Sequence, residues 1–221
     1  DIPSWNPVLF HTRDGRLWLY YKVGPSPGTW SAGRMYSDDE GVTWSKPEGL
    51  PAGLLGPIRA KPLVEADGTI VSGTSFEAYK TWAAWVERSR DGGKSWAKIG
   101  PITISAAVDE AETPAPDPAP GSPGFAAKDK GPRKTVGIIQ PSIISMGGKH
   151  LRMYARSQTL ASKIAVADSH DDGLTWTQAR FIDLPNNNSG IDAVALKDGR
   201  IVLVFNDTTR GRSPLNLAVS K

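Results

Sequence analysis

The sequence has 221 residues, 39% of them hydrophobic and 22% charged, which is the usual balance of a globular protein. Its net charge of +3 is spread along the chain and no apolar run is long enough to span a bilayer, so neither nucleic-acid binding nor a membrane span is expected. The absence of cysteine and the scatter of the 3 histidines exclude disulfides, a thiol nucleophile and a Cys- or His-based metal site. No metal and no cofactor are therefore expected. The first residues also lack the basic and apolar segments of a signal peptide.

Four glycine-containing turns divide the chain into repeated pairs of short apolar runs. The turns are Asp14-Gly15, Asp67-Gly68, Gly147-Gly148 and Asp198-Gly199. The runs before them cover residues 7–10, 62–64, 142–144 and 193–196, and the runs after them cover 17–23, 69–73, 151–155 and 201–205. Apolar runs on both sides of such a turn predict a β-hairpin. A third strand, over 33–36 and 164–167 in two of the units, and a fourth strand after it complete the four antiparallel strands of a propeller blade.

A second repeat follows the predicted third strand. Its three copies are SDDEGVTW at 37–44, SRDGGKSW at 89–96 and SHDDGLTW at 169–176. The shared glycine tolerates a positive φ, and the shared aspartate can accept hydrogen bonds from nearby backbone N–H groups, so the motif predicts a tight turn. The shared tryptophan, at Trp44, Trp96 and Trp176, is expected to pack between neighbouring blades. A Ca²⁺ site is the alternative, and it is disfavoured because the carboxylates already have a turn to hold.

The spacing of these motifs defines the repeating unit. The first and second copies begin 52 residues apart, whereas the second and third begin 80 residues apart. The excess falls on residues 105–134, which are rich in Pro, Ala and Gly and are predicted to form a flexible surface insertion, with a lid over a pocket as the alternative. The predicted blade units are 5–52, 57–104, 136–184 and an incomplete 188–221.

These features resemble the sialidase-like proteins with BNR (Asp-box) repeats. Five further segments strengthen the resemblance: WNPVLF at 5–10, GPIRAKP at 56–62, QPSI at 140–143, NNNSGIDAV at 186–194 and GRSPLN at 211–216. The resemblance implies an all-β propeller of four-stranded antiparallel blades, with six blades in the complete protein and about four in this chain. It also implies an extracellular or periplasmic location. The sequence departs from the sialidase pattern in two ways: no Arg-Ile-Pro motif occurs, and no tyrosine follows Tyr154. The complete set of sialidase catalytic residues is therefore not assigned.

The propeller geometry places the candidate site where the inner strands begin and the second strands end, since both meet on one face around the axis. The resemblance implies a glycoside hydrolase, or less readily a lyase, whose partner is a carbohydrate with a carboxylate group, such as a sialic or uronic acid. The candidates for proton transfer are Glu77 and Asp192, because glycoside cleavage needs positioned carboxyl groups. The candidates for substrate binding, through the carboxylate or the hydroxyl groups, are Arg59, Lys61, Lys22, Gln140, Arg156, Asn187 and Asn206.

Each candidate also has a structural alternative. Asp192 and Ser189 would brace the Asn-rich turn, and Arg156 and Lys22 would be solvated loop charges. Glu87 and Arg88 are interpreted as a surface pair. Tyr154 is interpreted as a core residue rather than a nucleophile. For the whole protein, the alternatives to an enzyme are a propeller that binds glycans without cleaving them and a scaffold that binds protein.

Overall fold

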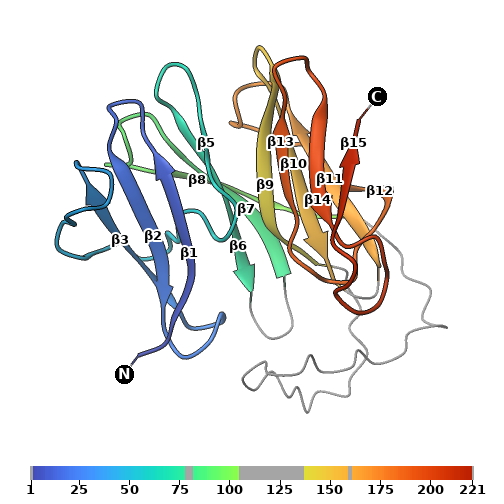
Figure 1. Ribbon diagram of the computed structural model, residues 1–221, viewed down its shortest axis with the longest axis horizontal. Helices are drawn as coiled ribbons and strands as arrows, with labels where there is room; N and C mark the ends of the chain where they lie inside the picture. The colour runs from blue at the N-terminus through green and yellow to red at the C-terminus, as the bar shows by residue number, and fades with distance from the viewer. Residues whose placement is uncertain (1, 78–81, 105–136, 159–160, 221) are drawn as a thin grey trace.

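The computed structural model describes residues 2–77, 82–104, 137–158 and 161–220, where the chain forms fifteen strands in four antiparallel sheets (Figure 1). The sheets follow one another in chain order and are called here the first to fourth blades. This arrangement confirms the predicted all-β propeller. The insertion predicted over 105–134 lies outside the described residues.

The strand bounds agree with the apolar runs that predicted them. The first blade holds β1 (Ser4–His11), β2 (Leu17–Val23), β3 (Ser31–Ser37) and β4 (Glu48–Gly49), and the second holds β5 (Leu63–Val64), β6 (Ile70–Glu77), β7 (Trp82–Ser89) and β8 (Ala97–Ile102). The third holds β9 (Ile138–Gly147), β10 (His150–Ser157), β11 (Lys163–Ser169) and β12 (Arg180–Pro185), and the fourth holds β13 (Asp192–Ala195), β14 (Ile201–Phe205) and β15 (Asn216–Val219).

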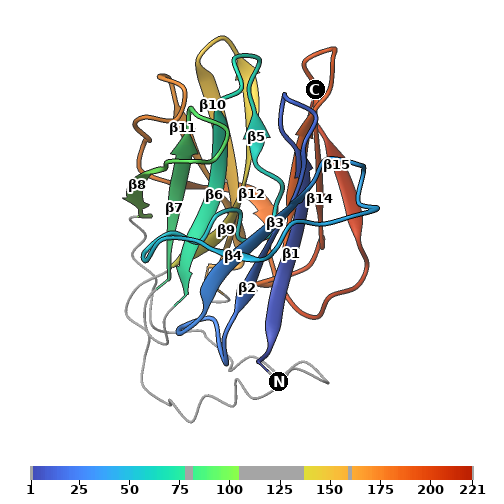
Figure 2. The same cartoon turned by 90° about the vertical axis from the view of Figure 1, so that its left-hand side faces the viewer.

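The direction of the strands gives the propeller two distinct ends. The hairpins between the first and second strands of the blades lie at the top in both views (Figures 1 and 2). The second strands β2, β6 and β10 run downward, away from these hairpins (Figure 1). The polar residues at the ends of the second strands therefore gather at the lower end, as the sequence predicts.

The Asp-box turns have the same hydrogen bonds in all three copies. In the first, the Asp39 carboxylate accepts bonds from the Thr43 N–H at 2.8 Å, the Thr43 hydroxyl at 2.6 Å and the Ser37 hydroxyl at 2.6 Å. The Trp44 indole N–H donates to the Gly41 carbonyl at 3.1 Å. Equivalent bonds hold the second and third boxes. The aspartates are thus engaged in the turn, as the structural interpretation predicts.

The apolar core is divided among the contacts between neighbouring blades. Val71, Val86 and Met153 belong to a cluster that joins the second blade to the third, while other clusters join the first to the second and the third to the fourth. Trp96 packs edge-on against Tyr20 of the first blade, with ring centroids 6.4 Å apart. Trp176 packs against the cluster between the second and third blades. Trp44 differs from the expectation, since it is 37% exposed on the outer side of the first blade.

Two arginines tie the first and second blades to the Asp box of the following blade. Arg88 on β7 donates to the Asp172 carbonyl of the third box at 2.9 Å, and Arg34 on β3 donates to the Gly93 carbonyl of the second at 2.6 Å. The interpretation of Glu87 and Arg88 as a surface pair is therefore wrong, because their exposed fractions are 0% and 6%. Both side chains point into contacts between blades, which the sequence pattern of a single strand does not reveal.

Candidate functional site

Two inner strands carry a bulge next to a proline at the lower end of the propeller. Asn6 precedes Pro7 in β1 and Gln140 precedes Pro141 in β9, and these residues have φ values of 46° and 54°. The pairing register shifts at the same places, between Trp5 and Val8 and opposite the step from Tyr154 to Arg156. A bulge re-aims a side chain, and a positive φ in a residue other than glycine is uncommon away from functional or strained sites. The local backbone thus turns Gln140 away from the regular β9 alternation.

The Gln140 amide joins the second and third blades. Its nitrogen donates to Glu77 Oε1 at 3.1 Å, and its oxygen accepts a bond from Arg156 Nη1 at 3.0 Å. Glu77 also accepts a bond from the Ser75 hydroxyl at 2.9 Å. Two side chains that end neighbouring second strands, Glu77 on β6 and Arg156 on β10, are therefore held in one network, which brings together three of the predicted site residues.

Arg156 is a desolvated cation with a fixed orientation. Its Nε and Nη2 donate to Asn188 Oδ1 at 3.1 and 2.9 Å, and its guanidinium carbon lies 5.6 Å from the centre of the Trp82 ring. Burial lowers the pKa of Arg156 to about 10; the Glu77 carboxylate opposes this shift, and the positive charges of Arg59 and Arg212 add to it. Arg156 is thus not a solvated loop charge, and three arginines from three blades act on one another through space.

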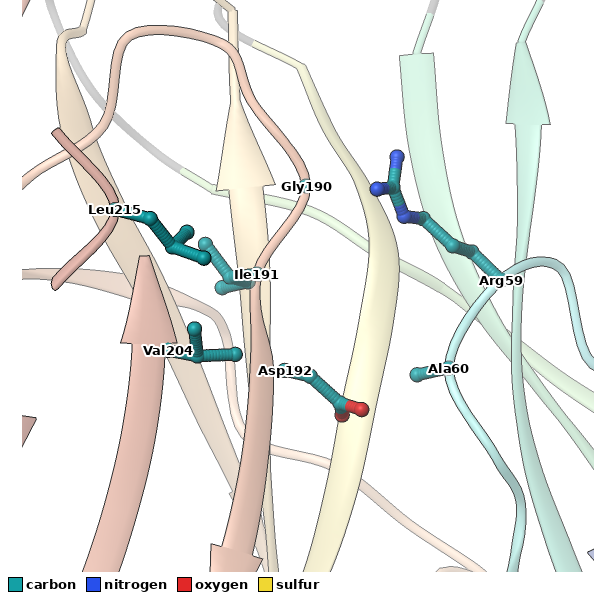
Figure 3. A pocket seen from close by; sticks show the side chains of 7 residues that line it. All are labelled: Arg59, Ala60, Gly190, Ile191, Asp192, Val204 and Leu215. Carbon is teal, nitrogen blue, oxygen red and sulfur yellow. The ribbon is translucent and has the colours of Figure 1, made fainter. Parts of the chain in front are cut away.

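Arg59 lines a pocket of about 280 Å³ between the second and fourth blades (Figure 3). A methyl group added at Gly190 would overlap the Arg59 guanidinium, so this side chain lies directly against the Gly190 backbone. Apolar side chains cover the fourth-blade side of the pocket: Ile191, Val204 and Leu215. A concave site with an apolar wall and few oriented polar groups is the usual form of a small-molecule site.

Asp192 lies in the same pocket at the start of β13. Its carboxylate accepts a bond from the Ser142 hydroxyl of β9 at 2.6 Å and points toward the segment that carries Ala60 (Figure 3). Nearby in the chain, the side-chain amide of Asn187 and the hydroxyl of Ser189 are buried without a hydrogen-bond partner among the described residues. Ser189 therefore does not brace the turn through its hydroxyl group, and Asn187 retains its hydrogen-bonding capacity.

Three predicted substrate-binding residues are placed differently from the expectation. Lys22 has an exposed fraction of 0% and donates to the Pro57 carbonyl at 3.0 Å, so in this structure it binds the backbone between the first and second blades. Asn206 is buried and donates to the Arg212 and Pro214 carbonyls at 3.0 and 2.8 Å, which fixes the loop after β14. Lys61 is exposed and is not among the residues that line the pocket.

The sequence interpretation missed Asn188 and Trp82, which contact Arg156, and Arg212, whose charge contributes to lowering the pKa of Arg156. Arg212 lies in the loop between a second and a third strand, which the propeller geometry places on the same face. The position of Arg212 in this loop could therefore have indicated it as a candidate site residue from the sequence. Asn188 and Trp82 carry no such signal, because an Asn-rich turn and a strand tryptophan are common structural features.

The lining of the pocket contains one cationic side chain, Arg59, and one carboxylate, Asp192. Within the ranges that the structure describes, no group of three or more His, Asp or Glu side chains could hold a metal ion. The same ranges contain no helix long and apolar enough to cross a membrane.

Comparison with known proteins finds similarity to two sialidases and to an arabinanase. Over 195 residues it is 28% identical to a sialidase from Micromonospora viridifaciens, a match that covers 88% of this chain and 26% of that protein. A Hadza microbial sialidase superposes with a TM-score of 0.70 at 18% identity, over 99% of this chain and 43% of that one. An α-L-arabinanase from Penicillium chrysogenum, solved with arabinobiose, has a TM-score of 0.65 at 15% identity, over 98% and 62%.

These matches differ in what they establish. At the identities of the two solved structures the likeness concerns the fold alone, and the chain spans less than two thirds of each protein compared. The family is established by residues 1–221, which match the BNR repeat-like domain throughout. The chain therefore belongs to the BNR repeat-like domain family, in agreement with its three Asp boxes and its propeller blades.

Proposed function

We propose that the lower face of this propeller forms the substrate pocket of a sialidase-like glycoside hydrolase that acts on glycosides of an acidic sugar, a sialic or a uronic acid. The observations that carry the proposal are the position of Arg59 in the pocket, against Gly190, and the fixed orientation of Arg156, whose pKa is lowered in part by the charges of Arg59 and Arg212. Cationic side chains close enough to act on one another favour the binding of an anion between them. A guanidinium matches a sugar carboxylate with two parallel N–H···O bonds, which a neutral sugar does not offer.

The remaining groups suit a sugar ring next to that carboxylate. The Asn187 amide, predicted to bind a sugar hydroxyl group, is buried without a partner in the described structure and does not line the pocket, so such a contact would need a local rearrangement. The apolar wall of Ile191, Val204 and Leu215 offers a surface for the less polar face of the ring. Glu77 and Asp192 are the carboxyl groups that would transfer protons during cleavage.

The roles of the two carboxyl groups follow from their surroundings. Glu77 is held in place by hydrogen bonds from Ser75 and Gln140, and Gln140 also binds Arg156. Glu77 is therefore assigned as the base or charge-stabilising group. Asp192 lies at the open edge of the pocket, where a leaving group would depart, and is assigned as the general acid.

Turnover and binding measurements test the proposal on the protein as it exists. The substrates are the 4-methylumbelliferyl glycosides of N-acetylneuraminic acid and of glucuronic acid. Glu77→Gln and Asp192→Asn are each expected to lower kcat by about 100-fold, the lower range for a general acid or base, while ligand affinity stays within about threefold. Glu48→Gln, on the exposed strand β4, is the matched control and should leave both quantities unchanged.

A propeller that binds acidic glycans without cleaving them is the second candidate. It is favoured by the hydrogen bonds that already engage both carboxylates, Glu77 with Ser75 and Gln140, and Asp192 with Ser142. Binding of the acidic glycosides without turnover by the wild type would support this candidate. If the wild type neither binds nor cleaves the acidic glycosides, both candidate functions are overturned.

A further inference from the structure

Two fully buried charged side chains hold the connector between the first and second blades. Lys22 on β2 donates from Nζ to the Pro57 carbonyl at 3.0 Å. Glu87 on β7 accepts bonds from the Leu55 N–H at 2.9 Å and from the Gly56 N–H at 2.6 Å. Three consecutive backbone groups of the connector 55–57 are thus bound by side chains from both neighbouring blades.

The connector passes through a narrow space between these blades. Gly56 has a φ of 62°, and an added side chain would collide with the Tyr20 ring of β2. Tyr20 itself is 1% exposed. The backbone at Gly56 therefore lies between the Tyr20 ring on one side and the Glu87 carboxylate on the other, and only glycine fits there.

Burying these charges is costly unless the hydrogen bonds compensate. Lys22 and Glu87 both have an exposed fraction of 0%. Burial lowers the pKa of Lys22 to about 8, although Glu87 and Glu77 oppose the shift. Burial also raises the pKa of Glu87, opposed by the Leu55 and Gly56 N–H groups and by Lys98 and Lys22. Each charge is compensated by backbone groups of the connector, so an apolar replacement would leave those buried groups without a partner.

Lys22 and Glu87 are together called the clamp here. The segment whose position depends on the clamp is the one that follows the connector 55–57. The Ile58 N–H donates to the Gly73 carbonyl of β6 at 3.1 Å, and Arg59 comes next, against Gly190 of the fourth blade. A backbone fixed at three consecutive residues leaves little freedom for a residue two positions later. We infer that Lys22 and Glu87 are positioning residues, which fix the connector 55–57 and thereby hold the Arg59 guanidinium at the mouth of the pocket. The ligand part of this inference rests on the proposed function.

Hydrogen exchange tests the clamp without reference to any ligand. Glu87→Leu removes both acceptors, whereas Glu87→Gln keeps an acceptor oxygen and nearly the same volume. Glu87→Leu should speed exchange at the Leu55, Gly56 and Ile58 amides by at least about tenfold, and Glu87→Gln should restore rates to within about threefold of the wild type. Amides of the third Asp box should not change, and Glu48→Gln is the control. Unchanged exchange at 55–58 in Glu87→Leu would overturn the inference.

A double-mutant cycle then tests whether the clamp acts through Arg59. The ligands are the methyl glycosides of N-acetylneuraminic acid and glucuronic acid. When Arg59 is present, Glu87→Leu and Lys22→Met should each weaken binding of the acidic glycoside at least about tenfold. In a protein that already carries Arg59→Ala, each should weaken binding by less than about twofold. An equal loss in both backgrounds would contradict a role through Arg59. If neither glycoside binds the wild type, the proposed function fails, and the exchange rates alone decide the clamp.

If Glu87→Leu does not fold, Lys22→Met carries the exchange measurement in its place. Lys22→Met removes the donor to the Pro57 carbonyl and keeps an apolar stem of similar length. Faster exchange confined to 55–58 in this variant supports the clamp. Exchange that rises equally throughout the first and second blades indicates a purely structural role and contradicts it.

Discussion

The guanidinium of Arg59, from the second blade, lies on the backbone of Gly190, which precedes β13 of the fourth blade. The conformation of Gly190 does not require glycine, because its φ lies outside the left-handed range. It is the space around Gly190 that requires glycine, because a side chain at this position would overlap the Arg59 guanidinium in its present position. Gly190 is therefore needed for the approach of Arg59 rather than for the turn.

Replacing Gly190 by alanine should displace Arg59 and weaken the binding of acidic sugars. We expect Gly190→Ala to raise the Kd of the acidic methyl glycosides at least about tenfold, the loss of roughly one charge-assisted hydrogen bond. Isothermal titration calorimetry measures this, with thermal unfolding to show that the fold persists. Gly49→Ala, at a site with open space around it, is the matched control. Unchanged affinity in Gly190→Ala would show that Arg59 does not contact the ligand.

The neutral amide of Gln140 is predicted to be essential for the network between Glu77 and Arg156. In Gln140→Glu a new carboxylate would face Glu77 and would pair with Arg156, taking that cation from the ligand. Two carboxylates so close do not both ionise readily, so one should retain a proton at a higher pH than usual. We expect acidic-sugar affinity to fall at least about tenfold at pH 7 and to recover partly at pH 4–5. A pH-independent affinity equal to that of the wild type would refute this.

Tyr154 is expected to contribute packing and no chemistry. Its exposed fraction is 7%, and it belongs to the cluster between the third and fourth blades with Ile164 and Phe205. Tyr154→Phe keeps the ring and removes the hydroxyl group. Steady-state kinetics should therefore show turnover and KM within about twofold of the wild type. Turnover that is slower by about 100-fold or more, with binding retained, would instead identify Tyr154 as a nucleophile.

The Asp boxes should make stability depend on pH in the acidic range. The Thr175 and Ser169 groups that bond Asp171 hold its pKa at about 2 in the folded state, below the value near 4 of an unfolded aspartate. The stabilisation is thus complete above about pH 4 and is lost as the pH falls through about 2. Asp171→Asn should lower Tm by roughly 2–4 °C at pH 6 and by clearly less at pH 2, where the folded-state carboxylate is already about half protonated. Thermal unfolding across this range checks it, and a constant difference would contradict it.

The blades could be predicted because their determinants are local. A box such as 169–176 contains its own turn glycine, its own carboxylate and its own tryptophan, so the pattern alone specifies the hairpin. Likewise Glu77 and Arg156 could be found because the ends of second strands meet on one face in any propeller.

Contacts between blades could not be predicted in the same way. Alternation along β2 and β7 does not show that Lys22 and Glu87 face a neighbouring blade instead of solvent, since each blade buries both faces. The sequence analysis predicts that Gln140 binds sugar hydroxyls, and it does not predict the contacts of Gln140 with Glu77 and Arg156. The bulge that turns Gln140 toward these two residues has no sequence signature apart from the following proline. Arg212 lies in an irregular loop, where no periodicity shows the direction of a side chain.

The most direct test of an acidic-sugar pocket compares one sugar with and without its charge. The methyl glycoside of N-acetylneuraminic acid and the methyl ester of the same glycoside differ only in the carboxylate. Calorimetry should show the acid binding at least about tenfold more tightly than the ester, and this advantage should disappear in Arg156→Met. Equal binding of acid and ester by the wild type, or an advantage that persists in Arg156→Met, would contradict the account.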